Sequence, residues 1–256
     1  MNKVILISID GMRPDGLLKC GHPYVETLLK NSTHTLNGRS VVPSVTLPCH
    51  MSIFLSVPPE RHGITTNLYM PTVRPVNGIM EQVKAADKKA SMYYGWEPIR
   101  DISRPGSLAH ARFIKARAED KTDRCLTETA LSDIRAFSPD FVFLYMVETD
   151  EKGGHDHGWM SDAYLACIYE AIDNVKNVVD AVGDTYNIII TADHGGHDRS
   201  HGTELSEDMT VPMFFMGDSF PKGKELETAS IMDIAPTVAA LMGISPAREW
   251  EGKSII

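Results

Sequence analysis

The histidines of this chain are concentrated in one part of the sequence, beside aspartates. Of the ten histidines, five fall between residues 155 and 201, namely His155, His157, His194, His197 and His201. The aspartates that alternate with them are Asp150, Asp156, Asp193 and Asp198. Imidazole and carboxylate groups without nearby cysteine form a ligand set for Zn²⁺ or Mn²⁺, and imidazole favours Zn²⁺ over Mg²⁺. Because open sites of this composition are usually catalytic, the pattern predicts a catalytic metal centre.

A second stretch places a threonine at the start of a helix. Thr46 stands just before Pro48, and an apolar stretch from Met51 to Val57 follows. Proline is common in the first turn of a helix, and a hydroxyl at this end of a helix lies where anions bind. The plainest interpretation of Thr46 is a helix N-cap. A threonine hydroxyl is also a weak nucleophile that a metal can activate, and the histidine–aspartate cluster could supply that metal.

Three short apolar runs lead to these aspartates and so are the elements that must position them. Each run is followed within three residues by an aspartate: residues 4–9 by Asp10, residues 141–147 by Asp150 and residues 188–191 by Asp193. Continuous apolar runs of this length are typical of strands buried on both faces of a parallel sheet. In such sheets ligands bind outside the carboxyl ends of the strands. A single aspartate there often only caps a turn, but three together indicate a site.

Helical patterns lie between these runs. They cover residues 122–136, residues 161–182 with Ser161 as the N-cap, and residues 231–242 before Gly243. Alternating strands and helices predict an α/β fold, a three-layer sandwich with a mostly parallel central sheet. The length of 256 residues fits a single domain, 1–256. The arginine-rich segment 95–120 has little pattern, so we expect a loop or a small insert over the site, with charges more typical of a solvated face than of a phosphate clamp.

Composition excludes several function classes. The chain has 25 basic and 34 acidic residues, a net charge of −9, and no basic run, so it is poorly suited to bind a nucleic-acid polymer. Its longest apolar stretch is far shorter than the roughly 20 residues of a membrane span. The four cysteines lie far apart and no secretory leader is visible. We therefore expect a cytoplasmic protein with reduced thiols and no membrane partner, whose oligomeric state stays open.

Several short motifs together resemble a known group of enzymes. In chain order they are Asp10-Gly11-Met12-Arg13-Pro14-Asp15, Thr46-x-Pro48-x-His50, His62-Gly63-Ile64-x-x-Asn67, Asp150…Gly154-His155-x-x-Gly158, Asp193-His194-Gly195, His201-Gly202 and Asp233-Ile234-Ala235-Pro236-Thr237. Each motif is weak alone, but their order resembles that of the alkaline phosphatase superfamily. Within it the match is best to the branch of nucleotide pyrophosphatases and phosphodiesterases, and it spans nearly the whole chain.

The resemblance implies an alkaline phosphatase-like domain with two divalent metal ions, zinc being expected and manganese the alternative. The residues that it assigns to one ion are Asp10, Thr46, Asp193 and His194, and those that it assigns to the other are Asp150, His155 and His201. It implies that Thr46 attacks phosphorus, that a phospho-threonine intermediate is then hydrolysed, and that the Asn67 amide binds a phosphate oxygen. Two ions would clamp the attacking and leaving oxygens of such a displacement. The expected partner is a small-molecule phosphate ester, hydrolysed as a diester or pyrophosphate.

One spacing departs from the family. The segment from Asp150 to His155 is one residue longer than the family's usual distance between these ligands. The two glycines before His155 could absorb the extra residue, or the role could pass to His157. We favour His155 because the Gly-His-x-x-Gly motif is intact. His157 and His197 are either groups that orient ligands or ordinary loop histidines, and packing is the better interpretation of Cys49 and His50.

Other activities compete with this prediction. A sulfatase needs Cys or Ser where this chain has Thr46, and a threonine cannot be converted to the required aldehyde. Related mutases carry a large cap domain, for which 256 residues leave little room. A phosphomonoesterase or a phosphonate hydrolase on the same site stays open. A metal-binding protein without turnover is disfavoured, because it would not need Thr46 and Asn67.

Overall fold

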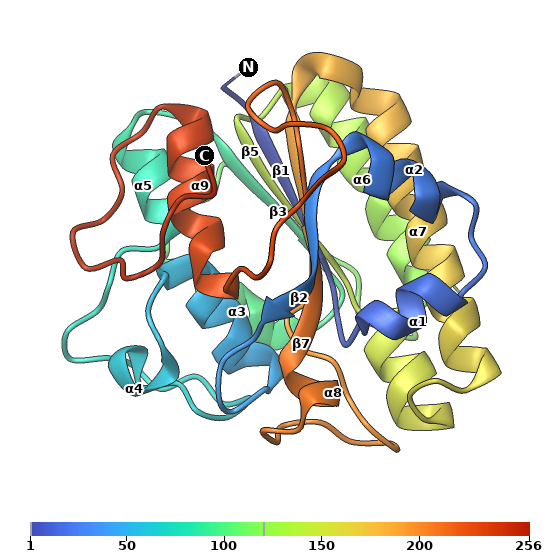
Figure 1. Ribbon diagram of the computed structural model, residues 1–256. Coiled ribbons are helices and arrows are strands. Elements are labelled where there is room, and N and C mark those ends of the chain that lie inside the picture. The colour runs from blue at the N-terminus through green and yellow to red at the C-terminus, as the bar shows by residue number, and fades with distance from the viewer. Residues whose placement is uncertain (1, 120) are drawn as a thin grey trace.

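The computed structural model describes residues 2–119 and 121–256. Within these residues, eight strands form one sheet in the order β4-β3-β5-β1-β6-β7-β2-β8 (Figure 1). The strands are β1 Val4–Ile9, β2 Thr33–Arg39, β3 Ala90–Tyr94, β4 His110–Phe113, β5 Phe141–Met146, β6 Asn187–Thr191, β7 Thr210–Met216 and β8 Lys224–Glu225. Of these strands, only β7 runs against the others, since it pairs antiparallel with both β6 and β2. The predicted α/β fold with a mostly parallel sheet is therefore confirmed.

Helices cover both faces of this sheet (Figure 1). One layer holds α1 Pro14–Lys19, α2 Tyr24–Asn31, α6 Thr122–Phe137 and α7 Asp162–Val182, and the other holds α3 Thr46–Leu55, α5 Ile79–Ala85 and α9 Ile234–Met242. The shorter helices are α4 Pro59–His62 and α8 Ser206–Met209, the 3₁₀ turns Glu97–Ile102 (η1), Gly183–Thr185 (η3) and Ile231–Asp233 (η4), and a π-helical turn, Thr149–His155 (η2). The arrangement is a three-layer sandwich.

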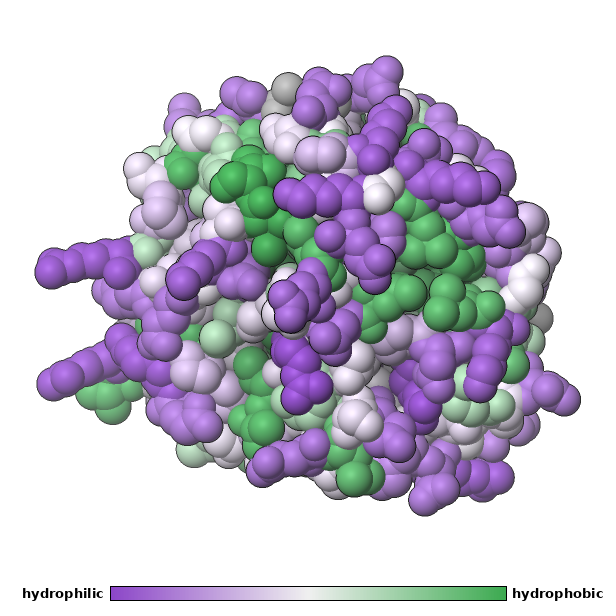
Figure 2. Space-filling model, viewed as in Figure 1, coloured by the Kyte–Doolittle hydropathy of each residue, from purple (hydrophilic) through white to green (hydrophobic). Residues whose placement is uncertain are grey.

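The core lies where the two helix layers meet the central strands. Every residue of β1, β5 and β6 is buried, because helices cover both of their faces. Phe54 of α3, for example, packs edge-on against Phe143 of β5, with ring centroids 4.8 Å apart. Hydrophilic residues cover most of the face seen in Figure 2, and hydrophobic residues there form separate patches. Among the described residues, no helix is long and apolar enough to cross a bilayer.

Most local elements predicted from the sequence are present. The three apolar runs are β1, β5 and β6, and α6 and α7 match the two longer helical patterns to within a residue. Ser161 is the N-cap of α7, with its hydroxyl oxygen accepting a hydrogen bond from the Tyr164 N–H. The last pattern divides into a 3₁₀ turn and α9, which ends at Gly243 in the left-handed conformation that glycine favours (φ 65°).

The segment 95–120 contains more regular structure than its sequence indicates. It includes the 3₁₀ turn η1 and the edge strand β4, which extends the sheet beside β3. Its arginines already have partners within the chain. Arg100 pairs with Glu97, Arg112 with Asp133, and Arg117 with both Glu151 and Asp156. These pairs agree with the prediction of a solvated charged face.

Candidate metal centre

The predicted ligands meet because three strand ends are level with one another. β1 lies between β5 and β6 in the sheet. Its last residue, Ile9, pairs with Met146 at the end of β5, and Ser8 pairs with Thr191 at the end of β6. The loops that leave these three strands therefore start side by side, and they carry Asp10, Asp150 and Asp193-His194.

One group of ligand atoms gathers around His194. Its Nε2 lies 3.2 Å from Asp10 Oδ1, 3.3 Å from Asp193 Oδ2 and 3.2 Å from the Thr46 hydroxyl oxygen. Asp10, Asp193 and His194 could together hold one ion, and all three side chains are buried. The predicted first set, which also includes Thr46, is thus brought together.

A second group forms around Asp150. His155 Nε2 lies 3.3 Å from Asp150 Oδ2, and His201 Nε2 lies 3.8 Å from Asp150 Oδ1. His194 is close enough to join Asp150 and His201 in a second possible ion site, because its ring stacks on that of His201 with centroids 3.8 Å apart. His194 therefore lies between the two groups, whereas the sequence assigns it to the first alone.

The histidines are oriented as metal ligands. The Nδ1–H of His194, His201 and His155 donates to the backbone carbonyl of Gly195, Ser44 and Arg199, respectively. In the neutral ring each Nε2 then keeps its lone pair and points toward carboxylates, which is the usual orientation of a metal-binding imidazole.

The carboxylates lack partners on the side where an ion would bind. Asp10 Oδ1, Asp150 Oδ1 and Asp193 Oδ2 are buried and accept no hydrogen bond from any described residue. Unsatisfied buried carboxylate oxygens are costly, and a divalent cation would satisfy them. Three such oxygens facing imidazole Nε2 atoms therefore fit the predicted pair of divalent ions.

The electrostatics of the metal-free chain follow from this crowding. Burial, together with the charges of Asp193 and Asp150, raises the pKa of Asp10 well above its ordinary value. Burial also lowers the pKa of His194 and lowers that of His201 to about 4, so both rings are neutral near pH 7 and ready to bind a cation. His155 differs, because its hydrogen bond to Asp150 raises its pKa to about 9. An ion that binds His155 must displace that proton.

The extra residue after Asp150 is accommodated by a π-helical turn. Residues Thr149–His155 form this turn, in which backbone hydrogen bonds join residues five apart rather than four. In an α-helix, the side chain four positions later lies on the same face as the first. In this wider turn the equivalent position is five residues later, so His155 lies on the same face as Asp150. His157 is exposed. This geometry favours His155 over His157.

Thr46 and Asn67 meet at the start of α3. The helix begins at Thr46 itself, with Val45 as its N-cap, so the predicted N-cap role of Thr46 is wrong. The Cys49 N–H donates to the Val45 carbonyl, which places Thr46 inside the first turn. Asn67 comes from the loop after α4, and its Oδ1 accepts a hydrogen bond from the Leu47 N–H at 3.0 Å.

Residues that the sequence did not single out for the site contact the predicted ligands. His50, expected only to pack, donates its Nδ1–H to the Thr46 carbonyl at 2.8 Å. The same nitrogen lies 3.4 Å from Asp193 Oδ2, and Nε2 is 3.0 Å from the Ser8 hydroxyl. The spacing of four residues between Thr46 and His50 was the available signal, since residues four apart share a helix face. The Tyr145 hydroxyl donates to Asp10 Oδ2. No motif indicated Tyr145, because that contact depends on the neighbouring strand.

A second supporting contact holds His197. Its Nδ1–H donates to Asp208 at 2.7 Å, and the same buried carboxylate accepts hydrogen bonds from the Thr203 N–H and hydroxyl. Asp208 therefore stabilises the loop between His194 and His201. The structure favours the interpretation of His197 as a loop histidine, because its partner is Asp208 and not a predicted ligand.

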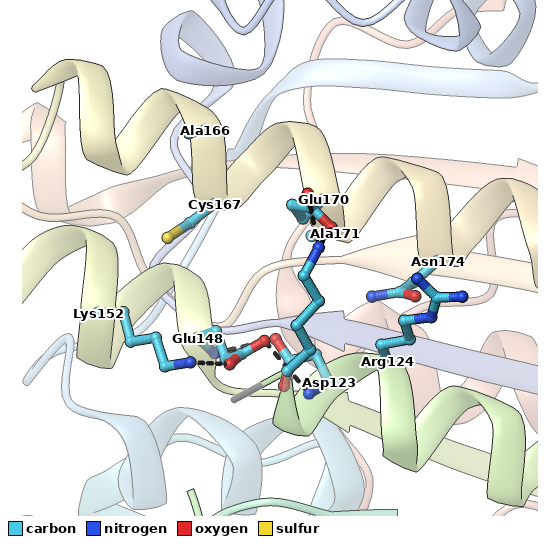
Figure 3. Close-up of a pocket in the computed structure, with 10 residues that line it drawn as sticks. Asp123, Arg124, Glu148, Lys152, Ala166, Cys167, Glu170, Ala171 and Asn174 are labelled. Carbon is cyan, nitrogen blue, oxygen red and sulfur yellow. Dashed lines mark hydrogen bonds and ion pairs between the residues drawn. The ribbon is translucent and has the colours of Figure 1, made fainter. Parts of the chain in front are cut away.

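A reciprocal pair of carboxylates holds the segment before Asp150. The Asp123 carboxylate accepts hydrogen bonds from the Val147 and Glu148 N–H groups, and the Glu148 carboxylate accepts them from the Thr122 and Asp123 N–H groups. Lys152 also pairs with Glu148, as Figure 3 shows. These residues line a cavity of about 170 Å³ between α6 and α7 that includes none of the predicted ligands.

Comparison with known proteins gives a family match over most of the chain. A model of the type I phosphodiesterase / nucleotide pyrophosphatase family matches residues 4–237. Rat ectonucleotide pyrophosphatase/phosphodiesterase family member 1 is 26% identical over 218 residues, which cover 75% of this chain and 24% of the rat protein. The chain thus spans about a quarter of the length of this and other curated relatives that it matches.

Solved structures share the fold at lower identity. Murine ectonucleotide pyrophosphatase/phosphodiesterase 5, an inactive threonine-to-alanine variant in complex with AMP, superimposes with a TM-score of 0.84 at 16% identity. The match covers 99% of this chain and 98% of that one. A phosphonate monoester hydrolase from Silicibacter pomeroyi gives a TM-score of 0.75 at 14% identity, over 100% of this chain and 76% of that one.

Proposed function

The chain belongs to the type I phosphodiesterase / nucleotide pyrophosphatase family, and from that premise we propose that it hydrolyses a phosphodiester or pyrophosphate bond. The proposed reaction passes through a phospho-threonine on Thr46 at a site for two divalent ions. The observation that carries this proposal is the position of the Thr46 hydroxyl oxygen, 3.2 Å from His194 Nε2. That nitrogen faces buried carboxylates, each with one oxygen that accepts no hydrogen bond from the described residues.

Two ions would be held by the residues already described. Asp10, Thr46, Asp193 and His194 would hold one. Asp150, His155 and His201 would hold the other, His155 through its position 3.3 Å from Asp150 Oδ2. His194 could bind on either side, because it also groups closely with Asp150 and His201. Bound ions of this kind lower the pKa of a hydroxyl and supply positive charge to a transferring phosphoryl group. We propose zinc, since three imidazoles contribute, with manganese as the alternative.

The residues of the chain then have distinct roles. The Thr46 hydroxyl oxygen forms a bond to phosphorus as the bond to the leaving oxygen breaks. Water later hydrolyses the bond between Thr46 and phosphorus, which frees the Thr46 hydroxyl and releases the remaining half of the diester as a phosphate monoester. The Asn67 side-chain oxygen is held by the Leu47 N–H, which leaves its amide N–H groups to donate to a phosphoryl oxygen.

The arginines of the segment 95–120, which the sequence predicts over the site, favour a diester over a monoester. A monoester carries one more negative charge, and an enzyme for it needs a cation to bind that charge. In the segment 95–120 the side chains of Arg100, Arg112 and Arg117 are paired with carboxylates, and Arg104 donates to Asn77 and to the Val76 carbonyl. The AMP complex of the murine relative makes nucleotide esters the first substrates to screen.

The test compares two model substrates on zinc-loaded protein, bis-p-nitrophenyl phosphate and p-nitrophenyl phosphate. We expect the diester to be hydrolysed faster. Thr46→Ala should abolish both rates, whereas the matched control Thr228→Ala, at an exposed threonine bonded to the Asn37 carbonyl, should leave them unchanged. Full activity in Thr46→Ala would overturn the mechanism. A faster monoester rate would indicate a phosphatase, and a Thr46-dependent rate only on phosphonates would indicate a phosphonate hydrolase.

The amount of zinc bound by variants distinguishes the role of Thr46 as nucleophile from the role of the carboxylates and imidazoles as metal ligands. Thr46→Ala should keep bound zinc, because the carboxylates and imidazoles of the site remain. Asp193→Asn and His201→Ala should each lose zinc as well as turnover. Metal analysis after gel filtration measures this directly, and a Thr46→Ala protein without zinc would contradict the assigned roles.

We further propose that the chain works in the cytoplasm on a small-molecule ester. The four cysteines are free thiols, which supports a reducing compartment. The net charge of −9 supports a small substrate rather than a nucleic-acid polymer. Fractionation of the native cells, followed by detection of the protein, tests the compartment.

A further inference from the structure

One tryptophan contacts all three loops that leave the central strands. Trp159 lies between the π-helical turn and α7 and is 7% exposed. Its indole ring lies against Gly11, Gly154 and Gly196, which belong to the loops after β1, β5 and β6, respectively. A Cβ at Gly154 or Gly196 would come within 2.5 or 2.2 Å of the ring. Only glycine allows the backbone to approach this closely.

Directional bonds fix the ring as well. The indole N–H donates to the Gly11 carbonyl at 2.9 Å, and the backbone N–H of Trp159 donates to the Asp198 carbonyl at 2.8 Å. The Tyr164 hydroxyl donates to the same Gly11 carbonyl. Trp159 is therefore joined to the loop that carries Asp10 and to the loop that carries His194 and His201.

The same ring supports two of the predicted ligands. His155 stands edge-on to Trp159 with centroids 5.3 Å apart and an interplanar angle of 85°, and His201 does so at 5.9 Å and 63°. Both imidazoles point their Nε2 toward Asp150. The side chain thus limits the rotation of both rings on the Asp150 side of the site.

We propose that Trp159 is a positioning residue that orients His155 and His201 toward Asp150, so that the affinity of the ion held there depends on the indole. This inference rests on the proposed two-ion site. A tryptophan that served only as core would affect folding stability but would not distinguish one ion from the other.

The experiment measures zinc binding to the whole chain by equilibrium dialysis with metal analysis. Wild-type protein should bind two ions. Trp159→Phe should bind the ion at Asp150, His155 and His201 about tenfold or more weakly, the loss typical of changing a group that supports a metal ligand. The ion at Asp10 should weaken less, because there only the hydrogen bond to the Gly11 carbonyl is lost. Excess zinc should restore hydrolysis by Trp159→Phe, whereas a purely structural defect would not be rescued.

Two further variants keep the test decisive. Trp250→Phe is the matched control, since its indole N–H also donates to a backbone carbonyl, that of Asn77 at 2.8 Å, and it should bind both ions normally. Gly154→Ala keeps the indole but displaces it, and should weaken the same ion if Trp159→Phe does not fold. Two ions bound with wild-type affinity by Trp159→Phe or by Gly154→Ala would overturn this inference. A wild-type chain that binds no zinc would overturn the proposed site instead.

Discussion

Three aspartates at the centre of the site show how function conflicts with stability at single residues. Asp10, Asp150 and Asp193 are buried close together, and each has an oxygen without a hydrogen-bond partner among the described residues. Burial raises the pKa of Asp193, as it does that of Asp10. The charge of Asp150 adds to this effect, although the hydrogen bond from His155 and the neighbouring imidazoles lower the pKa of Asp150 itself despite its burial. A bound cation would relieve the crowding of the three carboxylates.

Asp193→Asn should therefore stabilise the metal-free chain while abolishing zinc binding. Removing one of the crowded charges relieves repulsion and lets an amide donate to a neighbouring carboxylate. We expect the free energy of unfolding in EDTA to rise by about 1–2 kcal/mol, the scale of an unsatisfied buried polar group. Urea unfolding in EDTA measures it.

Asp208→Asn is the control for that prediction. Asp208 is equally buried, but its carboxylate accepts hydrogen bonds from His197 and Thr203. Replacing it should lower the free energy of unfolding with or without zinc. A destabilised Asp193→Asn in EDTA would show that the site is not crowded by unpaired charge in the metal-free chain.

At the scale of elements, the N-terminus of α6 and the end of β5 are joined by the Asp123–Glu148 pair seen in Figure 3. This contact places the π-helical turn that carries Asp150 and His155. Burial, with the charge of Glu148, raises the pKa of Asp123 to about 7 from an ordinary value of 3.8. Asp123 therefore binds a proton in the folded chain over a pH range where the unfolded chain has released it.

The sign of the resulting pH dependence follows from this difference in bound protons. Between about pH 4 and pH 7 the folded state holds the proton on Asp123, so raising the pH through this range lowers the free energy of unfolding. Asp123→Asn cannot titrate. The stability of the wild type relative to Asp123→Asn should fall from pH 4 to pH 7 and level off above pH 8, as measured by urea unfolding in EDTA. A difference that is flat or rises with pH would contradict the assignment.

At the scale of the whole molecule, the site joins parts of the chain that are far apart in sequence. The predicted ligands lie between Asp10 and His201 in the sequence. They come from the loops after β1, β5 and β6 and from the start of α3. An ion that binds them cross-links the sheet to the helix layer that contains α3. Its binding energy adds to the stability of the folded chain as a unit.

Zinc should accordingly raise the melting temperature in a concentration-dependent way. A ligand at 100 times its dissociation constant adds about 2.7 kcal/mol to the free energy of unfolding. Differential scanning calorimetry with and without zinc measures the shift, and magnesium at equal concentration should give a smaller one because imidazole prefers zinc. The shift should be absent in Asp193→Asn. An unchanged melting temperature for the wild type would argue against binding at this site.

Much of this molecule could be predicted from local sequence. The apolar runs of β1, β5 and β6 and the periodicity of α6 and α7 identify those elements, because burial on both faces or on one stripe leaves its mark within a few residues. The aspartates after these strands could be placed at one edge of the sheet, because the carboxyl ends of parallel strands lie at the same edge. By contrast, β2, β3, β4, β7 and β8 were not identified, because their pairing depends on partners distant in the chain.

The sequence by itself determined the central strands, the candidate ligands after them and roughly where the sheet would gather these residues. Only the tertiary structure decided how they meet: His194 between two ligand groups, Thr46 inside the first turn of α3, and His155 returned over Asp150 by a π-helical turn. The tertiary structure also decided which neighbouring side chains contact these residues, among them that of Trp159. The reason is that several of these contacts join distant residues, as His194 and Asp10 are 184 positions apart. Side chains so distant in sequence are placed by strand register and helix packing rather than by local pattern.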